Sequence, residues 1–154
     1  MATSRTGKQL AKRLEMIADG IGSHVEMYVR KAAVAADTAA VMSTPVDTGR
    51  ARSNWRVAIG APILTETGFS GPSKAKGGGK GRTEAFQSAL NEGMAVAPTW
   101  RLGMGSIFIS NSVPYIVRLD NGSSAQAPKG MTVKAIAAAR KQLIGARLLR
   151  NNDN

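Results

Sequence analysis

The sequence predicts an α+β domain in which a small, mostly antiparallel sheet packs with a long N-terminal helix, a short middle helix and a C-terminal helix. Three observations predict this class: an apolar stripe at helical spacing in the first third of the chain, two short stretches that alternate like strands, and a second helical stripe near the C-terminus. We expect residues 1–154 to form a single domain, because a chain of this length buries one core.

The N-terminal stripe advances in steps of three and four residues, which places its members on one helical face. It consists of Leu10, Leu14, Ile17, Ile21, Val25, Tyr28, Val29, Ala32 and Ala36. Gly20 and Gly22 interrupt the stripe and a capping-box pattern begins at Ser23, so one helix and two jointed helices both fit. The helix must end before Pro45, because the residue before a proline disfavours helical geometry.

Two segments have the alternation of strands with one buried face. Residues 55–59 alternate between turn-forming neighbours, and residues 106–110 do the same later in the chain. Residues 115–119 either continue the sheet or form a short turn. These segments predict a sheet too small to cover all the helix faces, which neighbouring copies in a ring could cover.

The remaining helices are predicted from caps and spacing. Thr83 begins a short middle helix that frays near Gly93 and Pro98, and the C-terminal helix begins near Thr132. We expect residues 150–154 to form a polar C-terminal tail. Between the first strand and the middle helix, residues 71–82 are rich in glycine and positive charge, and they predict a flexible loop.

The charge balance favours anionic partners. The chain carries 21 basic and 10 acidic residues, a formal net charge of +11, and such an excess attracts polyanions. In the loop, Lys74, Lys76, Lys80 and Arg82 suit contact with a phosphate backbone or with an acidic protein surface. The alternative is that these cations only solvate a surface loop.

The sequence offers few residues that suit catalysis. His24 is the only histidine, the carboxylates show no metal-binding or glycosidase spacing, and there is no cysteine. Lys80 follows Gly79 as in a phosphate-binding loop, but Gly81 stands where Ser or Thr is needed. The run 78–81 also fits an RNA-binding KH clamp weakly. We expect no enzyme, no catalytic residue, no cofactor and no metal site.

The N-terminus lacks a signal peptide's apolar core, and no run approaches the ~18 apolar residues that a membrane span needs. We therefore expect no membrane partner and synthesis in the cytoplasm.

One motif predicts a tight turn of the chain between the first helix and the first strand. Pro45 ends the helix, Asp47 and Thr48 can bond to nearby backbone, Gly49 supplies a conformation other residues resist, and Trp55 opens the strand. This segment resembles the "P-x-D-T-G-x-L-x-x-S" signature of phage neck and tail-completion proteins of the head-to-tail joining class.

A second motif agrees with the first in order. Asn111, Pro114 and Tyr115, followed by Asp120 and Gly122, are similar to the "N-x-x-P-Y-x-x-x-x-E-x-G" segment of that family. With the flanking helices, the resemblance covers residues 8–150. Ala51 stands where Leu is usual, Asp120 replaces the common Glu, and the basic loop lies outside the pattern.

The resemblance implies a non-catalytic virion protein at the neck, assembled in the host cytoplasm as a hexameric or dodecameric ring around the DNA channel. Its partners would be other copies of itself, neighbouring neck, portal-adaptor and tail proteins, and passing double-stranded DNA. The alternative is a basic nucleic-acid-binding protein, in which Trp55 and Trp100 beside arginines stack on bases. Such tryptophans more often anchor cores or interfaces.

Overall fold

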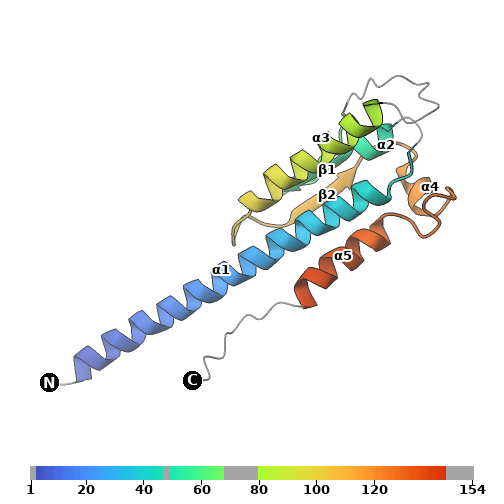
Figure 1. The fold of residues 1–154 in the computed structure, drawn as a ribbon. Helices are drawn as coiled ribbons and strands as arrows, with labels where there is room; N and C mark the ends of the chain where they lie inside the picture. The colour runs from blue at the N-terminus through green and yellow to red at the C-terminus, as the bar shows by residue number, and fades with distance from the viewer. Residues whose placement is uncertain (1–2, 47–48, 68–79, 145–154) are drawn as a thin grey trace.

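The computed structural model describes residues 3–46, 49–67 and 80–144 and confirms the α+β class (Figure 1). The elements are α1 Thr3–Ser43, α2 Arg50–Ser53, β1 Trp55–Ile59, α3 Lys80–Val96, the 3-10 turn η1 Ala97–Thr99, β2 Ile107–Asn111, α4 Ile116–Asp120 and α5 Thr132–Ile144. Asp47, Thr48, Lys74, Lys76 and the 150–154 tail lie outside the described residues.

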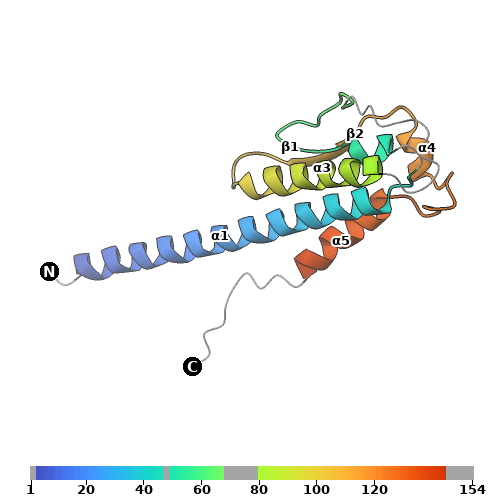
Figure 2. The same cartoon turned by 45° about the horizontal axis from the view of Figure 1, so that its top comes forward.

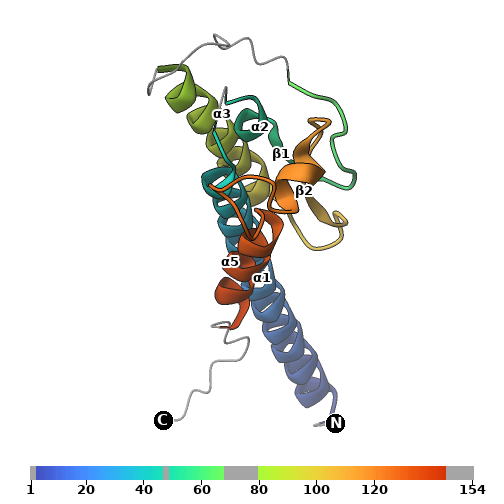
Figure 3. The ribbon, with the colours of Figure 1, turned by 90° about the vertical axis from the view of Figure 1, so that its right-hand side faces the viewer.

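The long helix α1 is the axis on which the other elements pack. α5 packs along one side of α1, and α3 packs along another (Figures 1 and 2). β1 and β2 contact α1 as well, and β1 also contacts α3. Figure 3, viewed from the end where α2 and α4 lie, shows the sheet beside these two helices. All of these elements gather around the C-terminal half of α1, and its N-terminal half extends beyond them.

α1 is one continuous helix through Gly20 and Gly22, which settles the two possibilities the sequence left open. Ser23 does not cap a second helix, because its hydroxyl donates to the Asp19 carbonyl one turn back, 2.9 Å away. A glycine inside a helix costs only about 1 kcal/mol relative to alanine, which a helix of 41 residues can absorb.

β1 and β2 form an antiparallel pair with Trp55 opposite Asn111 and Ile59 opposite Ile107. The first strand was predicted at its observed bounds. The second lies one residue later than predicted, at Ile107–Asn111, because Asn111 still pairs with Trp55.

The middle helix begins at Lys80, before the predicted start at Thr83, and it ends at Val96, close to Pro98 where fraying was predicted. α3 already includes Lys80, Gly81 and Arg82, so the segment predicted as a loop over 71–82 becomes helical at Lys80. The helix does not fray at Gly93. A β-carbon added there would lie 2.1 Å from Asp37 Oδ2, so Gly93 is the position where α3 packs closely against α1. This tertiary packing overrides the low helix propensity of glycine.

The C-terminal third adds two helices. Residues 116–120 form α4, so the segment predicted as strand or turn is a helical turn followed by a loop. α5 begins at Thr132 as predicted.

The core is built mainly of small side chains. One cluster joins α1, β1, α3 and the segment before α5, and it consists of Ala40, Val41, Trp55, Ala89, Ala127 and Met131. A second cluster of Ala33, Val57 and Ala97 lies under the other end of the sheet. Alanine at the contacts lets helices approach closely.

Candidate functional site

The first motif forms a corner between α1 and β1. Gly49 has φ 91° and ψ −10°, a left-handed conformation that favours glycine, and its carbonyl accepts a hydrogen bond from the Ser53 amide at 3.0 Å. Pro45 lies just beyond the end of α1, as predicted. The chain therefore leaves α1, reverses through Gly49 and the single turn of α2, and enters the sheet at Trp55.

Trp55 locks this corner to the end of α1. The Trp55 ring is 7 % exposed, and its Nε1 donates to Thr44 Oγ1 at 2.7 Å. Thr44 in turn donates to the Ala40 carbonyl at 2.7 Å. Buried tryptophan with a satisfied N–H is an anchor for packing, so Trp55 is not available to stack on a base.

Asn54, which the motif did not single out, fastens the next loop to the corner. Its side chain is 1 % exposed, its Nδ2 donates to the Arg50 carbonyl at 2.8 Å, and its Oδ1 accepts from the Thr67 amide at 2.6 Å. A buried amide with both ends satisfied is a strong positioning device, because leaving either end unpaired costs free energy. In the sequence, the indication for Asn54 was its place as a polar residue directly before the predicted strand.

The second motif joins the first through Asn111. The Asn111 Nδ2 donates to the Ala51 carbonyl in α2 at 2.6 Å, and its Oδ1 accepts from the Val113 amide at 3.2 Å. Asn111 also stands opposite Trp55 in the sheet. The two sequence motifs are therefore parts of one bonded unit, although sixty residues separate Ala51 from Asn111.

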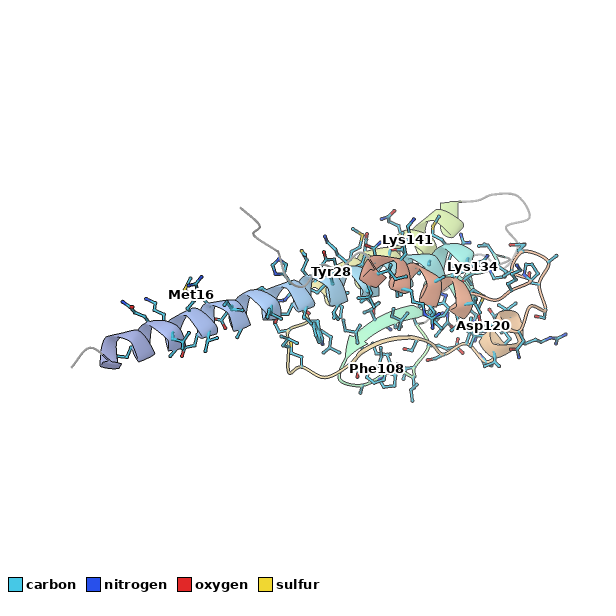
Figure 4. The ribbon with its side chains drawn as sticks, turned by 90° about the horizontal axis from the view of Figure 1, so that it is seen from below. Met16, Tyr28, Phe108, Asp120, Lys134 and Lys141 are labelled. Carbon is cyan, nitrogen blue, oxygen red and sulfur yellow. The ribbon has the colours of Figure 1, made fainter. Side chains whose placement is uncertain are left out.

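Asp120 caps α5 from a distance. Its Oδ1 accepts hydrogen bonds from the backbone amides of Met131 at 2.6 Å and Thr132 at 2.8 Å. Partial burial, the largest single effect, raises the pKa of Asp120, but the bonds from Thr132 and Met131 together outweigh it and lower the pKa overall. The Asp120 carboxylate thus caps the first turn of α5; Figure 4 labels Asp120 near the start of that helix.

Two glycines make this cap possible. Gly122 has φ 83°, and a β-carbon there would lie 2.5 Å from the Pro128 carbonyl oxygen. Gly130 has φ 73°, and its β-carbon would lie 2.1 Å from the Asp120 carbonyl oxygen. Gly122 belongs to the predicted motif, whereas Gly130 was missed, and its place just before the predicted helix start was the indication for it.

Pro114 and Tyr115 lie on the outer surface of the corner. Pro114 is exposed, and Tyr115 immediately precedes α4. The Arg50 guanidinium lies over the Tyr115 ring, 5.9 Å from its centroid, and pairs with Glu66 at 2.6 Å. These contacts tie the two motifs together on the surface as Asn111 does inside.

The most perturbed carboxyl was not predicted. Asp37 of α1 is 2 % exposed, and its Oδ1 has no hydrogen-bond partner among the described residues. Burial first, and the negative charge of Glu92 second, raise the pKa of Asp37 to about 7. Glu92 itself pairs with Arg56 at 2.6 Å. A carboxyl this well covered cannot reach a substrate, so we interpret Asp37 as a packing residue between α1 and α3.

The described residues bring no catalytic group together. His24 is exposed, and its Nδ1 lies 2.9 Å from the Gly20 carbonyl within the same helix. No three His, Cys, Asp or Glu side chains in the described part of the chain gather where they could hold a metal ion. Lys80 and Arg82 lie in the first turn of α3.

Large apolar side chains are exposed in two places. Leu10, Leu14 and Ile17 lie on the projecting half of α1, and Val133, Ile136, Leu143 and Ile144 lie on α5. Surface of this kind, gathered along helical stripes, is typical of interaction sites.

No family model, no curated protein and no solved structure matches the chain. Across the described residues, no helix combines the length and apolar composition needed to cross a membrane.

Proposed function

We propose that the protein is a structural virion component of a tailed bacteriophage, a neck or tail-completion subunit that forms a ring at the head-to-tail junction around the DNA channel. The observation that carries the proposal is the bond between the motifs: Asn111 of the second motif donates to Ala51 of the first at 2.6 Å. Two stretches that resemble the same family are expected to form one structural unit, and this bond joins them.

The chemistry of the motif residues supports a non-catalytic role. Gly49 and Gly122 adopt left-handed conformations, Trp55 is buried, Asn111 bridges two elements, and Asp120 caps a helix. Each of these residues is used to shape the chain. A subunit that acts by its shape needs such corners and has no need of a nucleophile.

The exposed apolar stripes on α1 and α5 support assembly. A soluble monomer gains nothing from Leu14 at 57 % exposure or Ile144 at 85 % exposure, whereas a ring subunit would cover such surface with its neighbours. The net charge of +11 suits a position beside DNA or acidic neighbouring proteins.

The proposal is tested by locating the chain in virions. Gold-labelled antibody against the protein should bind at the neck of particles of the phage that encodes it, and mass spectrometry of purified virions should detect the chain. Absence from purified virions would overturn the neck assignment. In that case the alternative, a basic nucleic-acid-binding protein, predicts tight binding to DNA by the isolated chain with a steep loss of affinity as salt rises.

A further inference from the structure

The C-terminal helix α5 uses one side to pack on α1 and leaves its other side exposed. The half-buried residues of α5 are small or polar: Ala135, Ala138, Ala139 and Gln142. The residues of the other side line an open hollow of about 600 Å³: Val133, Ile136, Ala137, Arg140, Lys141 and Ile144. We call this second set the exposed side of α5.

Large apolar side chains form the centre of the exposed side of α5. Val133 is 62 % exposed, Ile136 is 48 % exposed and Ile144 is 85 % exposed. Val133 and Ile136 lie about one helical turn apart, and Ile144 lies about three turns after Val133, so the three share one side of the helix. An amphipathic helix with anchors at such spacing is suited to lie in a groove of a protein partner.

The charges around this apolar centre are all positive. Lys134, Arg140 and Lys141 are exposed, and α5 contains no acidic residue. None of these three side chains takes part in an ion pair within the described part of the chain. Figure 4 shows α5 on the near side of α1, with Lys134 and Lys141 labelled. A surface that covers the apolar centre therefore comes close to three cations, and negative charge at its edge favours the contact.

A second copy of the chain does not supply that negative charge from its described residues. Most of the described carboxylates are engaged inside their own chain, in ion pairs, in the core or in a helix cap: Glu26, Asp37, Glu66, Glu92 and Asp120. Glu15 and Asp19 share one side of α1 with Lys8 and Lys12, so that side is not acidic. Two exposed sides of α5 placed face to face would bring like charges together, which is unfavourable.

Nucleic acid and a lipid surface each match only one feature of the exposed side. Nucleic acid is bound by cations and polar groups on its phosphates and by aromatic rings on its bases, and neither contact uses an exposed Val133 or Ile144. Helices that lie in a lipid surface carry Trp, Phe or Leu on the apolar side and a strongly polar side opposite. α5 has no aromatic residue, and its opposite side is mostly alanine packed on α1.

We propose that the exposed side of α5 docks in an apolar groove with acidic rims on a different protein of the particle. Val133, Ile136 and Ile144 enter the groove, and their burial supplies most of the affinity. Arg140 and Lys141 face the acidic rims and select the partner and its orientation. That the partner belongs to the particle rests on the proposed neck function, whereas its acidic and apolar chemistry rests on α5 alone.

A photo-cross-linker on α5 tests what covers this side. p-Benzoylphenylalanine is placed at Ile136 in cells that make the protein from its native genomic context, and the cells are irradiated. We expect a covalent product with a different protein, and we expect the cross-linked peptide to contain more Asp and Glu than Lys and Arg. Met94 of α3, which is 60 % exposed, is the matched control position and should give several-fold less of this product.

A charge reversal tests the role of the cations. Arg140→Glu together with Lys141→Glu should reduce the product at Ile136 several-fold, because the acidic rims then meet like charge. Lys8→Glu together with Lys12→Glu makes the same change in net charge on exposed positions of α1 and should leave the product unchanged. Arg140→Gln, which removes one charge without reversing it, should give a smaller reduction. Circular dichroism of the purified variants checks that they keep their helices.

The outcomes separate this docking surface from the neck function. A product at Ile136 with a second copy, with phospholipid or with nucleic acid would overturn the proposal, and so would equal products at Ile136 and Met94. If purified virions contain the chain but no protein is cross-linked at Ile136, the docking surface is wrong and the neck proposal stands. If an acidic protein is cross-linked while purified virions lack the chain, the neck assignment is wrong and the docking surface stands.

Discussion

At the scale of single residues, the backbone of Gly49 holds the corner. We expect Gly49→Ala to lower the free energy of unfolding by roughly 1–2 kcal/mol, because a side chain disfavours the left-handed conformation at φ 91°. Chemical denaturation measures the change. The matched control is Gly20→Ala in α1, where an added β-carbon meets nothing within 4 Å, and it should stabilise by about 1 kcal/mol. Equal effects of the two substitutions would contradict the assignment of the corner.

Asp37 should make stability depend on pH between about 4 and 7. The unfolded chain loses the Asp37 proton near 3.8, while the folded chain keeps it to about 7, so the stability that Asp37 contributes is full below 3.8 and is lost as pH rises through 7. The loss amounts to about 1.4 kcal/mol for each pH unit in that interval.

The measurement for Asp37 is denaturation from pH 4 to pH 8. Asp37→Asn removes the titrating proton and keeps the size of the side chain, so it should be more stable than the wild type at pH 8 and should lack this pH dependence. Asp19→Asn, at an exposed position of α1, is the control. Parallel pH profiles for the wild type and Asp37→Asn would mean that Asp37 is ionised in the folded protein.

Asp120 should show the opposite dependence. Its lowered pKa means that the stability it contributes is present above its ordinary value of 3.8 and is lost as pH falls through the folded value. Asp120→Ala should cost about 1 kcal/mol at pH 7, the usual effect of losing a helix cap. The neighbouring substitution Asn121→Ala, at an exposed side chain, should cost less. A matching loss in both variants would argue against the cap.

At the scale of elements, the sequence predicts types better than boundaries. The strand over Trp55–Ile59 and the start of α5 at Thr132 follow from alternation and spacing, which are local properties. The continuity of α3 through Gly93 depends on its contact with Asp37. A contact between segments so far apart in the sequence leaves no local pattern, so the sequence could not predict it.

In the candidate site, too, the sequence predicts some features and not others. Motif residues such as Gly49 and Asp120 could be singled out from the sequence, because turns and caps have compositional rules. Their partners could not be, since the bond from Asn111 to Ala51 and the cap that Asp120 places on α5 arise only when distant segments meet. Asp47 and Thr48, with the loop lysines Lys74 and Lys76, lie outside the described residues and remain predictions.

The two halves of α1 should differ in protection. Residues 7–19 are all exposed in the described part of the chain, whereas Ala32, Ala36 and Ala40 are buried beneath other elements. Amide hydrogen exchange followed by mass spectrometry should therefore be fast over residues 7–19 of the isolated subunit and slow in the second half of α1. In the proposed ring, neighbouring copies should cover the exposed stripe and protect residues 7–19. Fast exchange of these residues in both states would contradict their burial on assembly.

At the scale of the whole molecule, the arrangement is a small domain with one projecting helix. The two motifs meet at a corner that joins α1, the sheet and α5, while the projecting half of α1 and the exposed side of α5 leave apolar side chains in solvent. A domain whose motif residues shape its corners and whose apolar helical stripes stay exposed is suited to assembly. We therefore interpret the motifs as the part that shapes the subunit and the helical stripes as the part that joins subunits.

Assembly is tested most directly by the native mass of the purified protein. One chain has a mass of 16.1 kDa, and native mass spectrometry over a range of concentrations separates a single chain from a closed oligomer. The account predicts one discrete species at an integral multiple of this mass, with a ring visible by electron microscopy. A chain that stays at 16.1 kDa at every concentration, and that binds DNA tightly as a monomer, would contradict the account and favour a basic nucleic-acid-binding protein.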